Sequence, residues 1–325
     1  MSADTDTLRN LLPPAAASRL QSIRLADGAA TLVLDANGLS AAEREGLEAE
    51  VRRVLAGAPG VAEVRVALMA DKAPAPAGPV LLAVGSGKGG VGKSTLSANL
   101  AVALARLGLK VGMVDADIYG PSQPRLLGTE GVKPAARDSK MIPVQSPWGV
   151  GVLSMGQLID PGKAIAWRGP MVSNALSQLI DAQWGDTQVL VVDLPPGTGD
   201  IQLTMLQRFK PVGAVIVSTP QDLALMDATR AMQLFEVGGV PVVGLVENMA
   251  GYACPHCGEV SDPFGQGGVE AAAKEMGQDF LGRVPLTLSI RQDSDAGRPP
   301  AAGEGPQADA FLAIARRVAD WLNRH

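Results

Sequence analysis

The sequence predicts an α/β protein with a doubly wound, mostly parallel sheet, preceded by a small α+β domain. From residue 80 onward, short continuous apolar runs recur, which is typical of strands buried on both faces of a parallel sheet. Helical stretches separate several of these runs, and this alternation favours a doubly wound topology. The stretch 73–79 (APAPAGP) has the composition of a linker. We therefore expect a small domain at 1–72 and a larger one at 80–325.

The first 72 residues have the pattern of a small sheet that packs on one helix. The stretch 22–35 holds two short apolar runs around an Asp-Gly pair, which is a hairpin signal. Ser40 and Glu43 have the spacing of a capping box, and the apolar repeat that follows ends at Gly57. Alternation then predicts a last strand with Val64, Val66 and Leu68 on one side.

Seven apolar runs follow in the larger part of the chain. They are VLLAVG, KVGMVD, GVGVLSM, VLVVD, GAVIVST, VPVVGLVEN and LGRVP. After Ser94, a helical repeat of Leu96, Leu100, Leu104 and Leu107 ends at Gly108. The C-terminal stretch places Phe311, Ile314, Val318, Trp321 and Leu322 on one helical face. This stripe favours a closing helix packed on the sheet, and the alternative is a helix lying on a membrane.

Charge and composition exclude several classes of protein. The net charge of −5 offers no electrostatic reason to expect nucleic-acid binding. No apolar run approaches the ~18–20 residues needed to span a bilayer, and the first residues lack the pattern of a secretory signal. We therefore expect a cytoplasmic protein. With His256 and His325 as the two histidines, chemistry built on a histidine base is nearly excluded.

The stretch 85–95 (GSGKGGVGKST) carries a phosphate-binding pattern, G-x-x-x-x-G-K-[ST], between an apolar strand and a helix. Glycines let successive N–H groups point at phosphate oxygens, and the helix adds its positive N-terminal end. Lys93 is expected to reach the β- and γ-phosphates, Ser94 to ligate Mg²⁺ and Thr95 to contact the α-phosphate. The ATP-binding residues predicted here are Gly87, Lys88, Gly89, Gly90, Val91, Gly92, Lys93, Ser94 and Thr95. The alternative is an ordinary glycine-rich turn.

Aspartates end two of the apolar runs. Asp193 has the Walker B position, where a carboxylate can hold Mg²⁺ through water. Gly197 and Gly199 leave the next segment free to act as a nucleotide-sensing switch. Asp115 and Asp117 end another run, and hydrolysis needs an acceptor that orients the attacking water. For each of the three aspartates, the alternative is a cap of a turn or helix.

The two cysteines, Cys254 and Cys257, lie in the stretch CPHC. A close pair of this kind indicates metal binding or redox activity rather than a disulfide framework, and C-x-x-C thiolates can share one metal or cluster. A closed site usually needs four ligands. A dimer would supply four thiolates around a twofold axis. The alternatives are a redox pair, metal-free structural thiols and a zinc half-site. Zinc remains among them because the sequence does not distinguish a zinc site from an iron site.

The stretch KGGVGKST resembles the deviant Walker A motif of the MinD/ParA/nitrogenase-iron-protein class of ATPases. This resemblance implies that Lys88 reaches across a dimer interface to phosphates bound by the partner. It also implies that Asp115 lies near the metal and that Asp117 positions the water. By the same analogy Asn248 contacts adenine and Pro285 lines the base. The alternative for Lys88 is a solvated lysine beside an anion. Without the resemblance, a turn asparagine would explain Asn248 equally simply.

Taken together, GSGKGGVGKST, DADIYGPS, WRGPM, VDLPPGTGD and CPHC closely resemble the Mrp/ApbC family of P-loop ATPases that carry iron–sulfur clusters, over about residues 80–325. The resemblance implies Mg-dependent ATP hydrolysis with Lys88, Lys93 and Asp117 as catalytic residues and Ser94, Asp115 and Asp193 around Mg²⁺. It also implies a homodimer whose Cys254 and Cys257 hold a bridging 4Fe–4S cluster. Upstream scaffold proteins would supply this cluster, and recipient apoproteins would receive it.

The first 72 residues look like the small domain that often precedes the ATPase in bacterial members of this family, although its Asp-Pro-Glu and Leu-Gly elements are absent. Functions of other classes also fit parts of the pattern. One is a MinD- or ParA-like positioning ATPase, and another is a zinc-bridged ATPase dimer that acts as a scaffold. An electron-transfer ATPase fits less well, because its cysteines come from two separated segments.

Overall fold

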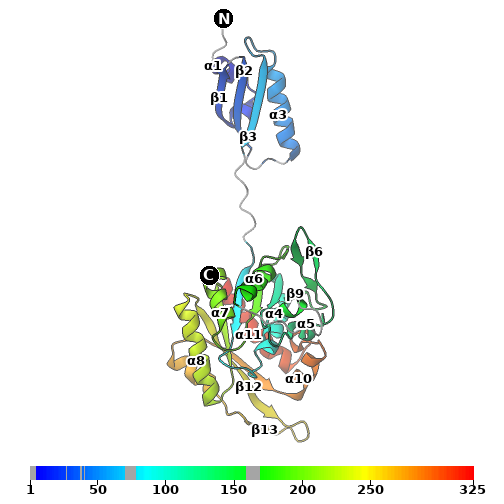
Figure 1. The fold of residues 1–325 in the computed structure, drawn as a ribbon, viewed down its shortest axis with the longest axis vertical. Helices are drawn as coiled ribbons and strands as arrows, with labels where there is room; N and C mark the ends of the chain where they lie inside the picture. The colour runs from blue at the N-terminus through cyan, green and yellow to red at the C-terminus, as the bar shows by residue number, and fades with distance from the viewer. Residues whose placement is uncertain (1–4, 27, 37–38, 40, 70–77, 159–168) are drawn as a thin grey trace. The chain divides into compact units, whose positions relative to one another are not determined.

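The computed structural model describes residues 5–26, 28–36, 39, 41–69, 78–158 and 169–325 (Figure 1). Internal contacts divide the chain into two compact units, Met1–Ala77 and Gly78–His325.

The smaller unit is a three-stranded sheet packed on one long helix. Its strands are β1 (Leu20–Ala26), β2 (Ala29–Asp35) and β3 (Glu63–Met69), and its helices are α1 (Thr5–Asn10), α2 (Pro14–Ala17) and α3 (Ala41–Leu55). Strands β1 and β2 form the expected antiparallel hairpin, and α3 connects β2 to the parallel strand β3. Leu32, Leu34, Val51 and Leu55 are buried between sheet and helix. Asp27 of the predicted turn and Ser40 of the predicted capping box lie outside the described residues.

The larger unit is built on a mostly parallel sheet. Its parallel strands are β4 (Val80–Gly85), β5 (Val111–Asp115), β9 (Val150–Ser154), β10 (Val189–Asp193), β11 (Gly213–Ser218), β12 (Val242–Ala253) and β14 (Phe280–Leu286). Neighbouring strands run in the order β14-β12-β11-β4-β10-β5-β9. Two short strands pair antiparallel with this sheet: β8 (Val144–Gln145) pairs with β9, and β13 (Val260–Ser261) pairs with β12. The seven apolar runs are thus the seven parallel strands, which confirms the predicted fold class. The hairpin of β6 (Ala135–Arg137) and β7 (Lys140–Ile142) was not predicted.

Helices cover both faces of this sheet. They are α4 (Lys93–Arg106), α5 (Gln123–Leu126), α6 (Gly169–Ile180), α7 (Asp200–Thr204), α8 (Asp222–Val237), α9 (Gly268–Glu275), α10 (Leu288–Asp295) and α11 (Pro306–Leu322). A π-helical turn, Met205–Phe209, continues α7, and 3₁₀ turns lie at Met155–Leu158 and Pro300–Ala302. Alternate side chains of β4 enter two separate cores. Leu82 and Val84 pack with α4 and α11, whereas Leu81 and Ala83 pack with α6 and α8.

Helix α4 is buried more completely than its sequence predicts. Leu96, Leu100 and Leu104 are buried as expected, but most of the residues between them are buried too. Helix α11 packs against both α4 and β14, so it lies beside α4 on the same face of the sheet and buries the flank of α4. Leu107 lies just beyond the end of α4 and is 38% exposed, so the predicted apolar stripe stops one residue earlier than expected.

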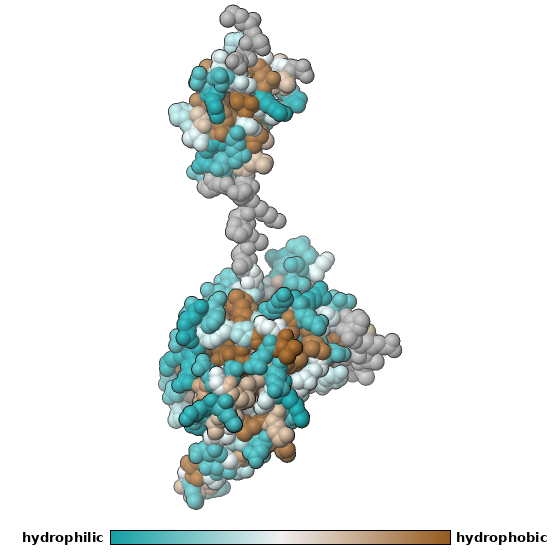
Figure 2. Space-filling model, turned by 90° about the vertical axis from the view of Figure 1, so that its left-hand side faces the viewer, coloured by the Kyte–Doolittle hydropathy of each residue, from teal (hydrophilic) through white to brown (hydrophobic). Residues whose placement is uncertain are grey.

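The closing helix α11 uses its apolar face inside the larger unit. Phe311, Ile314, Val318 and Trp321 are buried, and the helix packs against α4 and β14. This packing confirms the closing-helix interpretation and leaves that face unavailable to a membrane. Within the described residues, no helix combines the length and apolar character that crossing a bilayer requires. Elsewhere apolar residues are scattered among polar ones on the surface, as the face drawn in Figure 2 shows.

Candidate nucleotide site and cysteine turn

The predicted phosphate loop connects β4 to α4 at the carboxyl edge of the sheet. Gly90 and Gly92 have φ angles of +81° and +79°, which side chains other than glycine rarely adopt. Gly92 is the N-cap residue of α4 and leaves the first N–H groups of this 14-residue helix without a side-chain cap. The loop lines a hollow of about 220 Å³, and Asp117 and Pro196 complete its wall. Lys88 is half-buried and lines the same hollow.

Two glycines of the loop are also required by close packing. A Cβ atom on Gly87 would lie 2.0 Å from the backbone C and O atoms of Asp227 in α8. A Cβ atom on Gly92 would lie 2.1 Å from Nδ2 of Asn248 in β12. These approaches come from elements more than 130 residues away in sequence, so the motif alone does not predict them. The loop is therefore held between α8 and β12.

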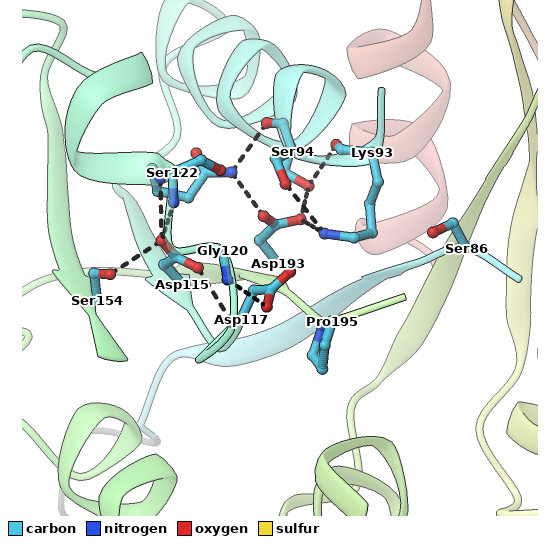
Figure 3. A network of polar contacts seen from close by, with 12 residues as sticks. Ser86, Lys93, Ser94, Asp115, Asp117, Gly120, Ser122, Ser154, Asp193 and Pro195 are labelled. Carbon is cyan, nitrogen blue, oxygen red and sulfur yellow. Dashed lines mark hydrogen bonds and ion pairs between the residues drawn. The ribbon is translucent and has the colours of Figure 1, made fainter. Parts of the chain in front are cut away.

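Lys93 and Asp193 form a buried ion pair at the centre of the site (Figure 3). The distance from Lys93 Nζ to Asp193 Oδ1 is 2.6 Å, and the two side chains are 6% and 0% exposed. Ser97 Oγ lies 2.8 Å from the same carboxylate oxygen. Gln123 Nε2 donates to Asp193 Oδ2 and to the Ser94 carbonyl, both at 2.9 Å. The carboxylate that the Walker B motif predicts is thus joined directly to the first turn of α4.

Asp115 is fully buried and accepts hydrogen bonds from the loop that follows β5 (Figure 3). Its Oδ2 atom accepts hydrogen bonds of 3.0 Å from the backbone N–H groups of Ser122 and Gln123 and from Ser154 Oγ. Its Oδ1 atom accepts from the Asp117 N–H at 3.2 Å. Burial, together with the charge of Asp193, raises the pKa of Asp115 to about 7, although these hydrogen bonds act in the opposite direction.

Asp117 lies on the wall of the hollow and is half-buried. Its Oδ1 atom accepts from the N–H groups of Tyr119 and Gly120 at 3.0 and 3.1 Å. On the opposite side, Gly197 has a φ angle of +87° and its N–H donates to the Ser86 carbonyl at 2.9 Å. The segments after β5 and β10 therefore flank the phosphate loop, and a groove of about 460 Å³ separates them.

Asn248 and Pro285 lie on the neighbouring strands β12 and β14, and Asn248 contacts the phosphate loop. Asn248 Nδ2 donates to the Val91 carbonyl at 2.7 Å. Val284, which precedes Pro285 in β14, is the register partner of Asn248. The structure therefore brings both residues to the carboxyl edge of the sheet, and their contact with adenine stays a prediction. Trp167 and Arg168 of the WRGPM motif lie outside the described residues.

The cysteine pair lies in a tight turn between β12 and β13. The Gly258 N–H donates to the Cys254 carbonyl at 2.8 Å, and the Cys254 N–H donates to the Glu259 carbonyl at 2.9 Å. Cys254 is half-buried and Cys257 is exposed. Hydrogen bonds from the backbone N–H groups of Cys257 and His256 lower the pKa of the Cys254 thiol, which favours the thiolate that binds metals. Across the described part of the chain, no three His, Cys, Asp or Glu side chains are grouped to hold a metal ion.

Comparison with known proteins decides the family. Residues 79–319 match the family model described as ParA, NUBPL iron-transfer P-loop NTPase. The chain belongs to this family. The match spans the whole sheet of the larger unit and confirms the resemblance predicted from the sequence.

Two curated relatives are similar to this iron-transfer P-loop NTPase over most of its length. A Pseudomonas fragi protein is 51% identical over 227 residues, which cover 69% of this chain and 79% of that protein. A Deinococcus radiodurans protein is 45% identical over 288 residues, covering 85% of this chain and 81% of that protein. Both relatives are named iron–sulfur cluster carrier protein.

Solved structures agree with the fold of this iron-transfer P-loop NTPase. A nucleotide-binding protein from Archaeoglobus fulgidus, in complex with ADP and with cobalt found, has a TM-score of 0.62 and 40% identity, covering 72% of this chain and 91% of that one. The cell division ATPase MinD from Pyrococcus furiosus has a TM-score of 0.56 and 25% identity, with 74% and 99% covered. The likeness to MinD is therefore more distant than the likeness to the cluster carriers.

Ser97 and Gln123, which both donate to Asp193 in this iron-transfer P-loop NTPase, were not predicted. Ser97 stands one helical turn after Lys93, and this i, i+4 spacing is a signal that could have identified it. Gln123 begins α5 and reaches Asp193 across 70 residues of sequence. Nothing local in the sequence points to Gln123, because its position depends on β5 and β10 being neighbours in the sheet.

Proposed function

We propose that this chain binds and hydrolyses ATP and carries an iron–sulfur cluster that it delivers to recipient apoproteins. The observation that carries the proposal is an exposed C-x-x-C turn at the end of β12, the same strand whose Asn248 contacts the phosphate loop. The family match and the printed names of the relatives support the same reading. The partners that such an activity requires are an upstream scaffold protein and recipient apoproteins.

Nucleotide binding rests on the phosphate loop and the first turn of α4. Backbone N–H groups of residues 87–95 are proposed to bind the phosphates of ATP, and Lys93 to neutralise the β- and γ-phosphates. Because Lys93 Nζ lies 2.6 Å from Asp193 Oδ1, phosphate oxygens compete with Asp193 for this ammonium group. Lys88 of a second chain is proposed to contact the same phosphates, in the manner that the deviant Walker A motif implies.

The residues around Ser94 suit Mg²⁺, which prefers oxygen ligands and keeps part of its water shell. The Ser94 hydroxyl would bind the ion directly, and Asp193 would bind it through water. Gln123 Oε1 and Ser122 Oγ are buried, have no hydrogen-bond partner among the described residues and can accept from such waters. When bound, Mg²⁺ neutralises charge on the β- and γ-phosphates.

The two aspartates after β5 have different proposed roles. Both carboxylate oxygens of Asp115 accept hydrogen bonds, so we infer that it holds the loop and stays outside the direct ligands of Mg²⁺. Asp117 lines the hollow and orients the attacking water.

Cluster binding requires two copies of the cysteine turn. One chain contributes Cys254 and Cys257, and a homodimer contributes four thiolates, the ligand number of a 4Fe–4S cluster. A twofold axis brings the same turn of both chains together. The lowered pKa of the Cys254 thiol favours the thiolate, which is its ligating form.

The test is anaerobic reconstitution of the purified full-length chain with iron and sulfide, followed by absorption and EPR spectra and an iron count. We expect about one 4Fe–4S cluster per two chains, lost in Cys254→Ser and in Cys257→Ser. His256→Ala is the matched control, because it changes the same turn and keeps both thiols, so its cluster content should be unchanged. Zinc bound at one ion per dimer, with no cluster taken up or passed to an apoprotein, would refute the proposal.

A further inference from the structure

Strand β12 joins the phosphate loop to the cysteine turn. It runs from Val242 to Ala253, with its first half buried in the sheet and its second half extending beyond the pairing with β11, which ends at Glu247. Asn248 is the first residue of this extension and donates to the Val91 carbonyl of the phosphate loop at 2.7 Å. Cys254 follows Ala253 directly. The extension therefore touches the nucleotide site at one end and carries the thiols at the other.

The strand is anchored firmly just before this extension. The Glu247 side chain is fully buried, and its carboxylate accepts from Arg283 Nε at 2.8 Å. It also accepts from the Gly267 N–H at 3.2 Å and from the Val269 N–H at 2.9 Å, at the start of α9. Arg283 is further paired with Glu270. These bonds hold residue 247 against β14 and α9, so the extension begins at a fixed point of the strand.

The extension contains an irregular joint. Asn248 pairs with Val284 and Tyr252 pairs with Leu286, so four steps along β12 correspond to two along β14. Within this bulge Met249 has a φ angle of +60°, which is uncommon for a residue with a long side chain. Gly251 has a φ angle of +72°. Strained backbone of this kind persists only where its surroundings hold it.

Two side chains of the joint lie next to Gly92 of the phosphate loop. A Cβ atom on Gly92 would lie 2.1 Å from Asn248 Nδ2 and 3.8 Å from Met249 Cε. Beyond the joint, Tyr252 and Ala253 pair with β13, and the turn that holds Cys254 is closed by backbone hydrogen bonds. The cysteine turn therefore moves together with this hairpin.

We propose that Asn248 and Met249 are positioning residues that make the exposure and spacing of the Cys254 and Cys257 thiols depend on the nucleotide at the phosphate loop. Binding of phosphate changes the loop at Val91 and Gly92, Asn248 follows the Val91 carbonyl, and the joint at Met249–Gly251 turns that displacement into a movement of the cysteine turn. This inference rests on the proposed function and adds how its two sites communicate.

The test uses thiol reactivity, which requires no cluster. The rate of alkylation of Cys254 and Cys257 by N-ethylmaleimide is measured on the reduced full-length chain by mass spectrometry, with and without a non-hydrolysable Mg·ATP analogue. We expect the nucleotide to change this rate by about fivefold or more, the size of a typical coupling between sites. Saturation is verified separately with a fluorescent ATP analogue. A rate ratio of one in the saturated chain overturns the proposal.

Two variants loosen or bend the joint. Met249→Gly removes both the side chain that lies next to Gly92 and the constraint at φ +60°, and we expect its rate ratio to fall to about one. Gly251→Ala is the second variant, because its Cβ would meet atoms only at 3.6 Å or more and the change is confined to backbone strain. It should also move the ratio toward one. Both variants are compared at saturating nucleotide, so that a change in nucleotide affinity does not alter the rate ratio.

Gly239→Ala is the matched control. Gly239 has a φ angle of +70°, which equals that of Gly251 within a few degrees, and no atom lies within 4 Å of its Cβ position. It lies in the loop between α8 and β12, away from the joint. Its rate ratio should equal that of the unchanged chain, and a ratio of one would mean that general strain explains the effect. Cluster uptake by the unchanged chain is measured in parallel. If this chain takes up no cluster but nucleotide still changes its alkylation rate, the proposed function alone is contradicted. If it takes up and transfers a cluster but nucleotide leaves the alkylation rate unchanged, this inference alone is contradicted.

Discussion

The nucleotide site and the cysteine turn differ in how much of their chemistry one chain supplies. Lys93, Asp115 and Asp193 are all buried, and each is bonded to partners within the chain. Cys254 and Cys257 lie at the end of a hairpin, with two thiols and no further metal ligand grouped with them in the described residues. The first site is therefore preorganised and contributes to folding. The second contributes little to folding, and in the proposed function a second chain completes it.

The largest effect is expected from breaking the buried ion pair. Lys93→Met leaves the Asp193 carboxylate buried without its cation, and we expect the free energy of unfolding to fall by about 3–5 kcal/mol. Nucleotide binding should be lost as well. Denaturant unfolding and binding of a fluorescent ATP analogue measure the two effects.

The double variant Lys93→Met with Asp193→Asn is the control for this prediction. It removes the uncompensated charge, so most of the stability should return while nucleotide binding stays lost. A single Lys93→Met variant as stable as the unchanged chain would contradict the pairing of these side chains in solution.

A close approach within the phosphate loop gives the next effect. A Cβ atom on Gly87 collides with the α8 backbone at Asp227, so Gly87→Ala should destabilise the chain by about 1–3 kcal/mol. Gly89→Ala is a matched control two residues away, because its Cβ would meet only Pro196 Cγ at 3.8 Å. Thermal unfolding of both variants checks the prediction. Equal midpoints would show that α8 does not approach the loop this closely.

Titration of Asp115 gives an effect on stability that depends on pH. Its pKa is raised from 3.8 to about 7, so the folded chain binds this proton more tightly than the unfolded chain. The resulting stabilisation is fully present below about pH 4 and is lost as the pH rises through about 7, by up to about 1.4 kcal/mol per pH unit. Asp115→Asn should remove this component when unfolding free energies are compared between pH 5 and 8. Identical pH profiles for the two chains would argue against the raised pKa.

The smallest effect on stability is expected at the cysteine turn. Exchanging both thiols in Cys254→Ser with Cys257→Ser should change the free energy of unfolding by less than about 0.5 kcal/mol, because the turn is largely exposed. Nucleotide affinity should also be unchanged, while cluster binding is lost. A large loss of stability in the metal-free chain would mean that the turn is part of the folded core, and the contrast between the two sites would fail.

Much of this fold follows from patterns that are local in the sequence. Continuous apolar runs stay buried only where both faces of a strand are covered, so the seven runs predict a parallel sheet between two layers of helices. The phosphate loop can also be predicted from the sequence, because its glycines and Lys93 all belong to one motif of eleven residues. The cysteine spacing indicates half of a metal site for the same reason.

Contacts between distant segments were decided only by the tertiary structure. The bond from Lys93 to Asp193 spans 100 residues, and that from Asn248 to Val91 spans 157. Both exist because the strand order places β4 between β10 and β11, with β12 next to β11, an order that differs from the order along the chain. Periodicity reports which face of a segment is buried and carries no information about which segment covers it. The sequence by itself therefore determined the elements and the chemistry of each motif, and the packing of the sheet determined which motifs meet.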